Sequence, residues 1–170
     1  MAEDHPHYQS LDELLAAHQV DVLAIASPNG LHAEQAIAGL NAGAHVIIEK
    51  PMSLTKSDAE RVLHLALQKG LYVFGVMQNR YSPPSEWLRS VVQSGSLGEI
   101  LQVHIDCFWN RDDRYYRSGG WHGSKDLDGG TLFTQFSHFI DILYWVFGEV
   151  KPLSALLRNY NHSKSIAFED

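Results

Sequence analysis

Two stretches of the chain place polar side chains directly after an apolar run. "VDVLAIAS" ends at Ser27 and leads into the turn residues Pro28 and Asn29, and "AHVIIEKPM" runs from β-branched residues into Glu49 and Lys50. Ligands of open parallel sheets bind at the carboxyl ends of the strands. Either stretch alone fits a turn with solvated charges, but together they favour a binding site that includes Ser27, Asn29, His32, Glu49 and Lys50.

A third stretch, "TLFTQFSHFIDILYWVF", combines a helical apolar pattern with a polar stripe. At 100° per residue, one narrow sector holds Thr131, Thr134, His138, Asp141 and Trp145. An imidazole exchanges protons near neutral pH, and a neighbouring polar group can fix its tautomer. His138, flanked by Thr134 and Asp141, is therefore predicted to be an acid or base; the alternative is a hydrogen-bonded core histidine.

The first half of the chain is predicted to be an α/β unit that positions the first two stretches. Continuous apolar strands that alternate with helices indicate a parallel sheet covered on both faces. Ser57 is the expected N-cap of the third helix, and Gly43 and Gly70 are expected to end the second and third helices. The predicted elements are helix 11–18, strand 20–27, helix 32–42, strand 45–49, helix 57–70 and strand 71–76.

The pattern changes after Gln78, where an α+β arrangement with a mainly antiparallel open sheet is predicted. In "ILQVHIDCFW" apolar and polar residues alternate, which is typical of a strand with one wetter face. The predicted elements are helix 86–93, strand 100–109, a long loop over 110–130, helix 131–147 and a strand near 150–157.

Composition narrows the classes of protein. The 170 residues are 45% hydrophobic with a formal net charge of −7, and Lys and Arg are scattered, which argues against nucleic-acid binding. The single cysteine, Cys107, excludes an intramolecular disulfide framework. No apolar run suits a membrane span and the N-terminus is acidic, so a cytoplasmic protein is expected. The histidines lack zinc-site spacing, and no metal is expected.

Five segments in order, "SPNGLH", "EKP", "QNRY", "FWNRDDRYYRSGGWHG" and "DGGTLFTQFSHFID", resemble the glucose-fructose oxidoreductase / inositol dehydrogenase / MocA (Gfo/Idh/MocA) family. The Phe-Trp-x-Arg, Tyr-Tyr and Gly-Trp run is similar to nucleotide-sugar 3-dehydrogenases acting on UDP-N-acetylglucosaminuronic acid. This resemblance implies a Rossmann NAD(P)-binding part over residues 1–78 and part of a C-terminal α/β domain over 79–170. It also implies a homo-oligomer formed through the C-terminal sheet.

The implied reaction is oxidation of a sugar or nucleotide-sugar secondary alcohol, with NAD favoured over NADP. Lys50 would stabilise the developing alkoxide, and His138 would accept the hydroxyl proton. The resemblance assigns the cofactor to Ser27, Pro28, Asn29, His32, Glu49, Lys50, Asn79 and Trp121. It assigns the substrate to Arg80, Arg111, Tyr116, Thr134, Gln135 and His138, with Arg111 and Tyr116 at its anionic end.

The sequence departs from the family pattern in two places. Thr134 stands where many members have an aspartate one turn before the histidine, which favours a nucleotide-sugar substrate. A G-x-G-x-x-G turn, which holds the cofactor pyrophosphate, does not occur. The chain is therefore expected to be an internal fragment that is inactive by itself. Alternatives are a non-catalytic oligomerisation module of the same fold and a metal-dependent hydrolase built on His138 and Asp141.

Overall fold

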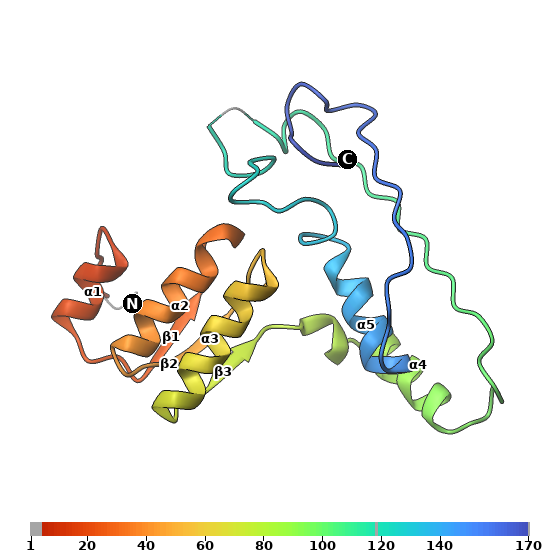
Figure 1. Ribbon diagram of the computed structural model, residues 1–170, viewed down its shortest axis with the longest axis horizontal. Helices are drawn as coiled ribbons and strands as arrows, with labels where there is room; N and C mark the ends of the chain where they lie inside the picture. The colour runs from red at the N-terminus through yellow and green to blue at the C-terminus, as the bar shows by residue number, and fades with distance from the viewer. Residues whose placement is uncertain (1–4, 118, 170) are drawn as a thin grey trace. The chain divides into compact units, whose positions relative to one another are not determined.

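The computed structural model describes residues 5–117 and 119–169 (Figure 1). The chain divides into two compact units, each described by itself below. The first unit contains the chain before Pro28 together with Leu31–Gly75, and the second contains Pro28–Gly30 and the chain from Val76. The elements of the first unit are α1 (Leu11–Ala17), β1 (Val22–Ile25), α2 (His32–Asn41), β2 (His45–Ile48), α3 (Lys56–Lys69) and β3 (Val73–Gly75).

The predicted parallel sheet is confirmed. Its order is β1-β2-β3, and both ladders are parallel. Leu23 is paired with Val46 and Ile25 with Ile48, so the buried side chains of neighbouring strands lie in register. This register brings the carboxyl ends of β1 and β2 to one edge, where the segments Ser27–Asn29 and Glu49–Lys50 begin.

The sheet is covered on one face, and the prediction of two covered faces is wrong. Leu23, Ile25, Val46 and Ile48 are buried against α2 and α3, whereas Val22 on the alternate face is 50% exposed. The reason is topological. Strands that follow one another in sheet order through right-handed crossovers place their helices on the same side, as Figure 1 shows for α2 and α3.

The third helix begins earlier than predicted. Its N-cap is Thr55, not Ser57: the Thr55 hydroxyl accepts a hydrogen bond from the Asp58 backbone N–H at 3.1 Å. An N-cap hydroxyl bonds the backbone two or three residues later, and Thr55 and Asp58 have this spacing. The predicted stop at Gly70 is confirmed by its left-handed φ of 67°.

In the second unit, α4 (Pro83–Gln93) packs against α5 (Ser137–Phe147), and the short 3₁₀ helix η2 (Gln78–Tyr81) contacts both. The α5 helix begins six residues later than predicted. The Thr134 hydroxyl donates to the Gly130 carbonyl, and the backbone N–H groups of Phe133 and Thr134 close turns on the same oxygen. These bonds form isolated turns over Gly130–Thr134, and Thr131 and Thr134 precede the helix that carries His138.

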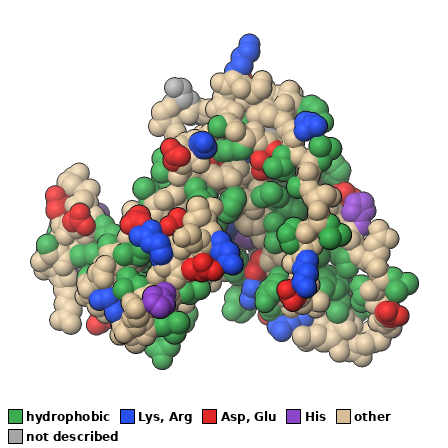
Figure 2. Space-filling model, viewed as in Figure 1, with side chains coloured by type: hydrophobic (Ala, Val, Ile, Leu, Met, Phe, Trp, Pro, Cys, Tyr) green, Lys and Arg blue, Asp and Glu red, His purple; other side chains and the backbone are tan. Residues whose placement is uncertain are grey.

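The two strands predicted in the second half do not form. Residues 100–109 and 150–157, all of which the structure describes, run without strand pairing. An alternating pattern suits a pleated strand, but a strand exists only where a neighbour completes its ladder. Several apolar side chains here remain in solvent, among them Leu101 at 86% exposure, Phe108 at 92% and Leu153 at 98%. Figure 2 shows hydrophobic side chains reaching the molecular surface.

Among the helices of the described residues, none is long and apolar enough to span a bilayer.

Candidate active site

His32 joins the turns that follow β1 and β2. Its ring lies at the start of α2 with 1% of its surface exposed. The Nε2 atom lies 2.8 Å from the Ser27 carbonyl oxygen and the Nδ1 atom 2.7 Å from the Pro51 carbonyl oxygen. A buried carbonyl without a partner is costly, and one ring N–H can donate to either carbonyl, so the imidazole ties together the two turns that carry the predicted cofactor residues.

The turn after β2 presents the predicted catalytic lysine. The Glu49 backbone N–H donates to the Ile25 carbonyl at 2.9 Å, which extends the β1–β2 ladder by one residue. The Lys50 N–H donates to the Glu49 carboxylate at 3.2 Å, and the Lys50–Pro51 peptide bond is cis. Lys50 is partly buried at this edge, and Ser27, also partly buried, donates to Gln35 Oε1 at 2.6 Å. Four predicted site residues of the first unit are thus gathered at the carboxyl ends of β1 and β2: Ser27, His32, Glu49 and Lys50.

Asn29 and Gly30, in the short 3₁₀ helix η1 (Asn29–Leu31), belong to the second unit and bond another loop of the same unit. The Asn29 side-chain amide donates to the Asp128 carbonyl at 2.8 Å, and the Gly30 N–H donates to the Leu127 carbonyl at 3.0 Å. Asn29 is 6% exposed. Its amide group therefore fixes the backbone of this loop.

Asp128 organises the same loop from within. Its side chain is fully buried, and its carboxylate accepts hydrogen bonds from the Gly123 N–H at 2.7 Å and the Gly130 N–H at 3.3 Å. Carboxylates bonded to backbone N–H groups form strong, charge-assisted contacts. Sequence reasoning missed Asp128, although an aspartate just before two glycines is a turn signal.

A stack of rings connects Trp121 to Arg111. The Trp121 and His122 ring centroids are 3.9 Å apart, and His122 and Tyr115 are 4.2 Å apart. The Arg111 guanidinium carbon lies 4.5 Å from the Tyr115 ring centroid, in cation–π geometry. Burial raises the pKa of the Tyr115 hydroxyl. Burial also lowers the pKa of His122, where the Asp128 charge opposes the decrease and the Arg111 charge adds to it.

The His122 environment predicts a loss of stability in acid. The pKa of His122 is 6.5 when unperturbed and lower in the folded chain, so below pH 6.5 the unfolded state binds more protons. The stabilising contribution is complete above that pH and is lost as pH falls through the lowered pKa. We expect His122→Phe, which keeps a stacking ring but cannot be protonated, to reduce the difference between urea midpoints measured at about pH 8 and about pH 5.

The control is His104→Phe, because the His104 side chain is 76% exposed. All four tryptophans belong to the second unit, so tryptophan fluorescence follows the unfolding of this unit. An unchanged difference in midpoints in His122→Phe would contradict the assignment of this acid sensitivity to His122.

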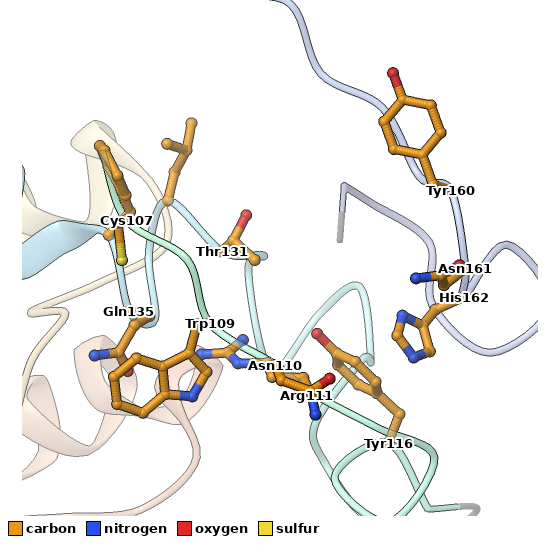
Figure 3. Close-up of a pocket in the computed structure, with 12 residues that line it drawn as sticks. Cys107, Trp109, Asn110, Arg111, Tyr116, Thr131, Gln135, Tyr160, Asn161 and His162 are labelled. Carbon is orange, nitrogen blue, oxygen red and sulfur yellow. The ribbon is translucent and has the colours of Figure 1, made fainter. Parts of the chain in front are cut away.

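A cavity of about 410 Å³ in the second unit gathers three of the predicted substrate residues, Arg111, Tyr116 and Gln135. In Figure 3, Cys107, Trp109 and Gln135 lie on one side and Tyr160, Asn161 and His162 on the other, with Arg111 and Tyr116 between them. A fourth predicted residue, Thr134, accepts a hydrogen bond from Arg111 Nη1 at 3.1 Å. The volume is within the range of small-molecule sites, about 300–1,000 Å³.

Tyr116 lines this cavity and has a buried hydroxyl. Tyr116 is 6% exposed, and within the described part of the chain its hydroxyl has no hydrogen-bond partner. A buried tyrosine hydroxyl normally has a partner. Together with the Arg111 guanidinium, it offers a polar corner that suits an oxygen-rich, anionic molecule.

Arg80 and Asp141 form a two-pronged ion pair between η2 and α5. Arg80 Nε donates to Asp141 Oδ2 at 2.7 Å and Nη2 donates to Oδ1 at 2.5 Å, and Asp141 raises the pKa of Arg80 further. Both oxygens of Asp141, which the sequence places one turn from His138, accept hydrogen bonds from Arg80. His138 is 7% exposed, on the second unit's α5, while Lys50 belongs to the first unit.

The remaining predicted residues are partly buried: Pro28 next to Asn29, Asn79 in η2 beside Arg80, and Trp121 in the ring stack. Several cavity residues were missed by the sequence prediction. Cys107 and Trp109 lie in the segment 100–109 that was predicted to be a strand, and Tyr160, Asn161 and His162 carry no motif that would single them out. They are identified as cavity residues only by the folded chain.

Comparison with known proteins gives relatives for both halves of the chain. The family described as "Oxidoreductase family, NAD-binding Rossmann fold" matches residues 2–76, and the family described as "GFO/IDH/MocA C-terminal domain" matches residues 86–170. An uncharacterized oxidoreductase of Synechocystis sp. is 33% identical over 88% of this chain and 40% of its own length. The scyllo-inositol 2-dehydrogenase (NADP(+)) of Bacillus subtilis is 28% identical over 85% of this chain and 40% of its own.

Solved structures give the same picture. The WlbA dehydrogenase from Bordetella pertussis, in complex with NADH and UDP-GlcNAcA, has a TM-score of 0.79 and 36% identity over 83% of this chain and 41% of its own. The WlbA dehydrogenase from Thermus thermophilus, in complex with NAD and UDP-GlcNAcA, has a TM-score of 0.63 and is 28% identical over 75% of this chain and 40% of its own. The chain thus spans about two fifths of the length of these relatives. Its two halves match the two regions of one family in order, and the chain belongs to the GFO/IDH/MocA family of oxidoreductases.

Proposed function

We propose that this chain supplies cofactor and substrate residues to an NAD(P)-dependent dehydrogenase acting on a nucleotide-linked sugar acid, with NAD as the favoured cofactor. Most of the cofactor residues lie in residues 1–78, and residues 79–170 supply the substrate residues together with Asn79 and Trp121 for the cofactor. The family membership and the WlbA complexes with NAD or NADH and UDP-GlcNAcA support this assignment. The reaction is oxidation of a secondary alcohol, at C3 of the amino-sugar acid.

Lys50 and His138 carry the chemistry in this proposal. The Lys50 ammonium donates a hydrogen bond to the reacting hydroxyl and stabilises the charge that grows on its oxygen. The His138 imidazole accepts the hydroxyl proton. When bound, the nicotinamide ring supplies the acceptor for the hydride. The residues that would hold the cofactor are Ser27, Pro28, Asn29, His32, Glu49, Asn79 and Trp121. Of these, His32 acts indirectly, because its buried ring holds the turns that follow β1 and β2.

The observation that carries the proposal is the second unit's cavity. A space of about 410 Å³ is lined by Arg111, by Gln135 and by Tyr116, whose hydroxyl has no partner among the residues that the structure describes. Arginine binds carboxylate and phosphate in two-pronged geometry. Arg111 and Tyr116 therefore hold the anionic end of the substrate, with Thr134 and Gln135 on the sugar side.

Tyr116→Phe separates ligand binding from folding. The change removes one hydroxyl that has no partner in the described chain, so the free energy of unfolding is expected to stay the same or rise slightly. Binding of UDP-N-acetylglucosaminuronic acid, measured by isothermal titration calorimetry, is expected to weaken about 3- to 10-fold, the loss of one hydrogen bond.

The matched control is Tyr115→Phe, which removes a hydroxyl from the neighbouring ring, a residue that is not among those lining the cavity. Its affinity is expected to equal that of the unchanged chain. Absence of saturable binding of both UDP and the UDP-sugar acid to the unchanged chain would overturn the substrate assignment.

A non-catalytic oligomerisation module of the same fold is the second candidate. The observation in its favour is the exposure of large apolar side chains, such as Leu101 and Leu153, in the segments predicted to form a sheet. A homo-oligomer through this region in the cytoplasm is compatible with both candidates. Sedimentation of the chain with and without the UDP-sugar acid separates them, because only the enzyme candidate requires ligand binding.

A further inference from the structure

Asp141 lies one helical turn after His138 on α5, and its carboxylate is held from outside the helix. Residues three apart on a helix are neighbours, with about 5–6 Å between their Cβ atoms. The Asp141 carboxylate is nevertheless directed to Arg80, 61 positions earlier in the chain, through both oxygens. The ion pair therefore binds the helix that carries His138 to the turn that carries Asn79.

The pair is better suited to fixing geometry than an ordinary surface contact is. Exposed ion pairs contribute little to stability, but the Asp141 side chain is only 11% exposed and that of Arg80 is 31% exposed. The guanidinium fork sets the orientation as well as the distance. One turn further along α5, the Arg89 guanidinium lies 4.3 Å from the Trp145 ring centroid, so α5 is also held by α4.

We propose that Arg80 and Asp141 are positioning residues, whose ion pair fixes α5 against η2 and balances the Asp141 charge that lies one turn from His138. This inference rests on the proposed function, in which His138 accepts the substrate proton. Arg80 then acts through Asp141 instead of touching the sugar. A proton acceptor beside an unneutralised carboxylate would stay protonated to higher pH, so engagement of Asp141 by Arg80 favours an acceptor that is free of a proton at neutral pH.

The test uses the whole chain with isotope-labelled histidine and follows the His138 ring resonances by NMR as pH is changed. Arg80→Gln leaves the Asp141 carboxylate unpaired, and the His138 ring is expected to titrate at a pH higher by about 0.5 or more. Asp141→Asn leaves the guanidinium, and the ring is expected to titrate at lower pH. In the double variant both charges are gone, and the titration is expected to return toward that of the unchanged chain.

The other ionisable groups of the elements packed on α5 are Tyr81, Glu86, Arg89 and Tyr144, and all remain in every variant. Arg61→Gln is the control, because Arg61 makes exposed ion pairs with Glu34 and Asp58 in the first unit. The charge-reversed pair, Arg80→Asp with Asp141→Arg, tests for restoration of the His138 titration if a single variant fails to fold.

A merely structural pair would lower the urea midpoint in the single variants and leave the His138 titration unchanged, which would overturn the inference. No ligand is needed for this experiment. The chain could bind no nucleotide sugar and still show His138 titrating at higher pH in Arg80→Gln and at lower pH in Asp141→Asn. That result would refute the proposed substrate while supporting the Arg80–Asp141 role.

Discussion

Replacing His32 with alanine is expected to lower the free energy of unfolding of the first unit by about 3–5 kcal/mol. The imidazole is 1% exposed, so its removal leaves a cavity between α2 and the turns. The carbonyl oxygens of Ser27 and Pro51, now 2.8 and 2.7 Å from the ring nitrogens, would lose their partner. Both losses fall on the turns that carry Ser27 and Lys50.

His32→Phe separates the two causes, because phenylalanine fills most of the volume but donates no hydrogen bond. We expect it to cost about half as much as alanine, roughly 2 kcal/mol. His64→Ala is the matched control: His64 is exposed on α3 of the same unit and bonds Gln68. A change within about 0.5 kcal/mol is expected for this surface substitution.

Hydrogen exchange followed by mass spectrometry suits this measurement, since peptides covering β1 and β2 report on the first unit alone. A loss of 3 kcal/mol corresponds to roughly 100-fold faster exchange if these amides exchange by unfolding of the unit. Equal exchange rates in His32→Ala and His64→Ala would contradict the role of His32 in holding the two turns.

The parallel sheet could be predicted because its signals are local. The apolar runs around Leu23 and Val46, and the helix stop at Gly70, each depend on residues adjacent in sequence. The position of the predicted site at the ends of β1 and β2 then follows from sheet geometry alone. The single covered face depends on strand order, which no local pattern contains.

The contacts that define the second unit's site could not be predicted, because they join distant positions. Asn29 and Asp128 are 99 positions apart, and Arg80 and Asp141 are 61 apart. The polar stripe singled out Asp141 as a neighbour of His138 but could not indicate Arg80, since helical spacing points only to neighbours on the same helix. Likewise, the alternation over residues 100–109 describes a surface that suits a strand, not the presence of a strand to pair with it.

Replacing Gly30 with alanine is expected to lower the free energy of unfolding of the second unit by about 2–4 kcal/mol. A Cβ atom at Gly30 would lie 1.9 Å from the Asp126 carbonyl oxygen and 3.0 Å from the Leu127 Cα atom. Both are backbone atoms, so no side-chain rotation relieves the clash. The turn would have to move off the loop, breaking the Gly30 N–H bond to Leu127 and the Asn29 amide bond to Asp128.

The readout for Gly30→Ala is tryptophan fluorescence during urea unfolding, because every tryptophan lies between residues 87 and 145, far along the chain from position 30. Gly75→Ala is the matched control: its added Cβ atom would meet only the Met52 Cε atom at 3.9 Å, an ordinary contact. A shift of the tryptophan transition in Gly30→Ala but not in Gly75→Ala is expected. Identical transitions in the two variants would mean that the turn after β1 is not docked on the Asp126–Asp128 loop, and Asn29 would then have no fixed place in the site.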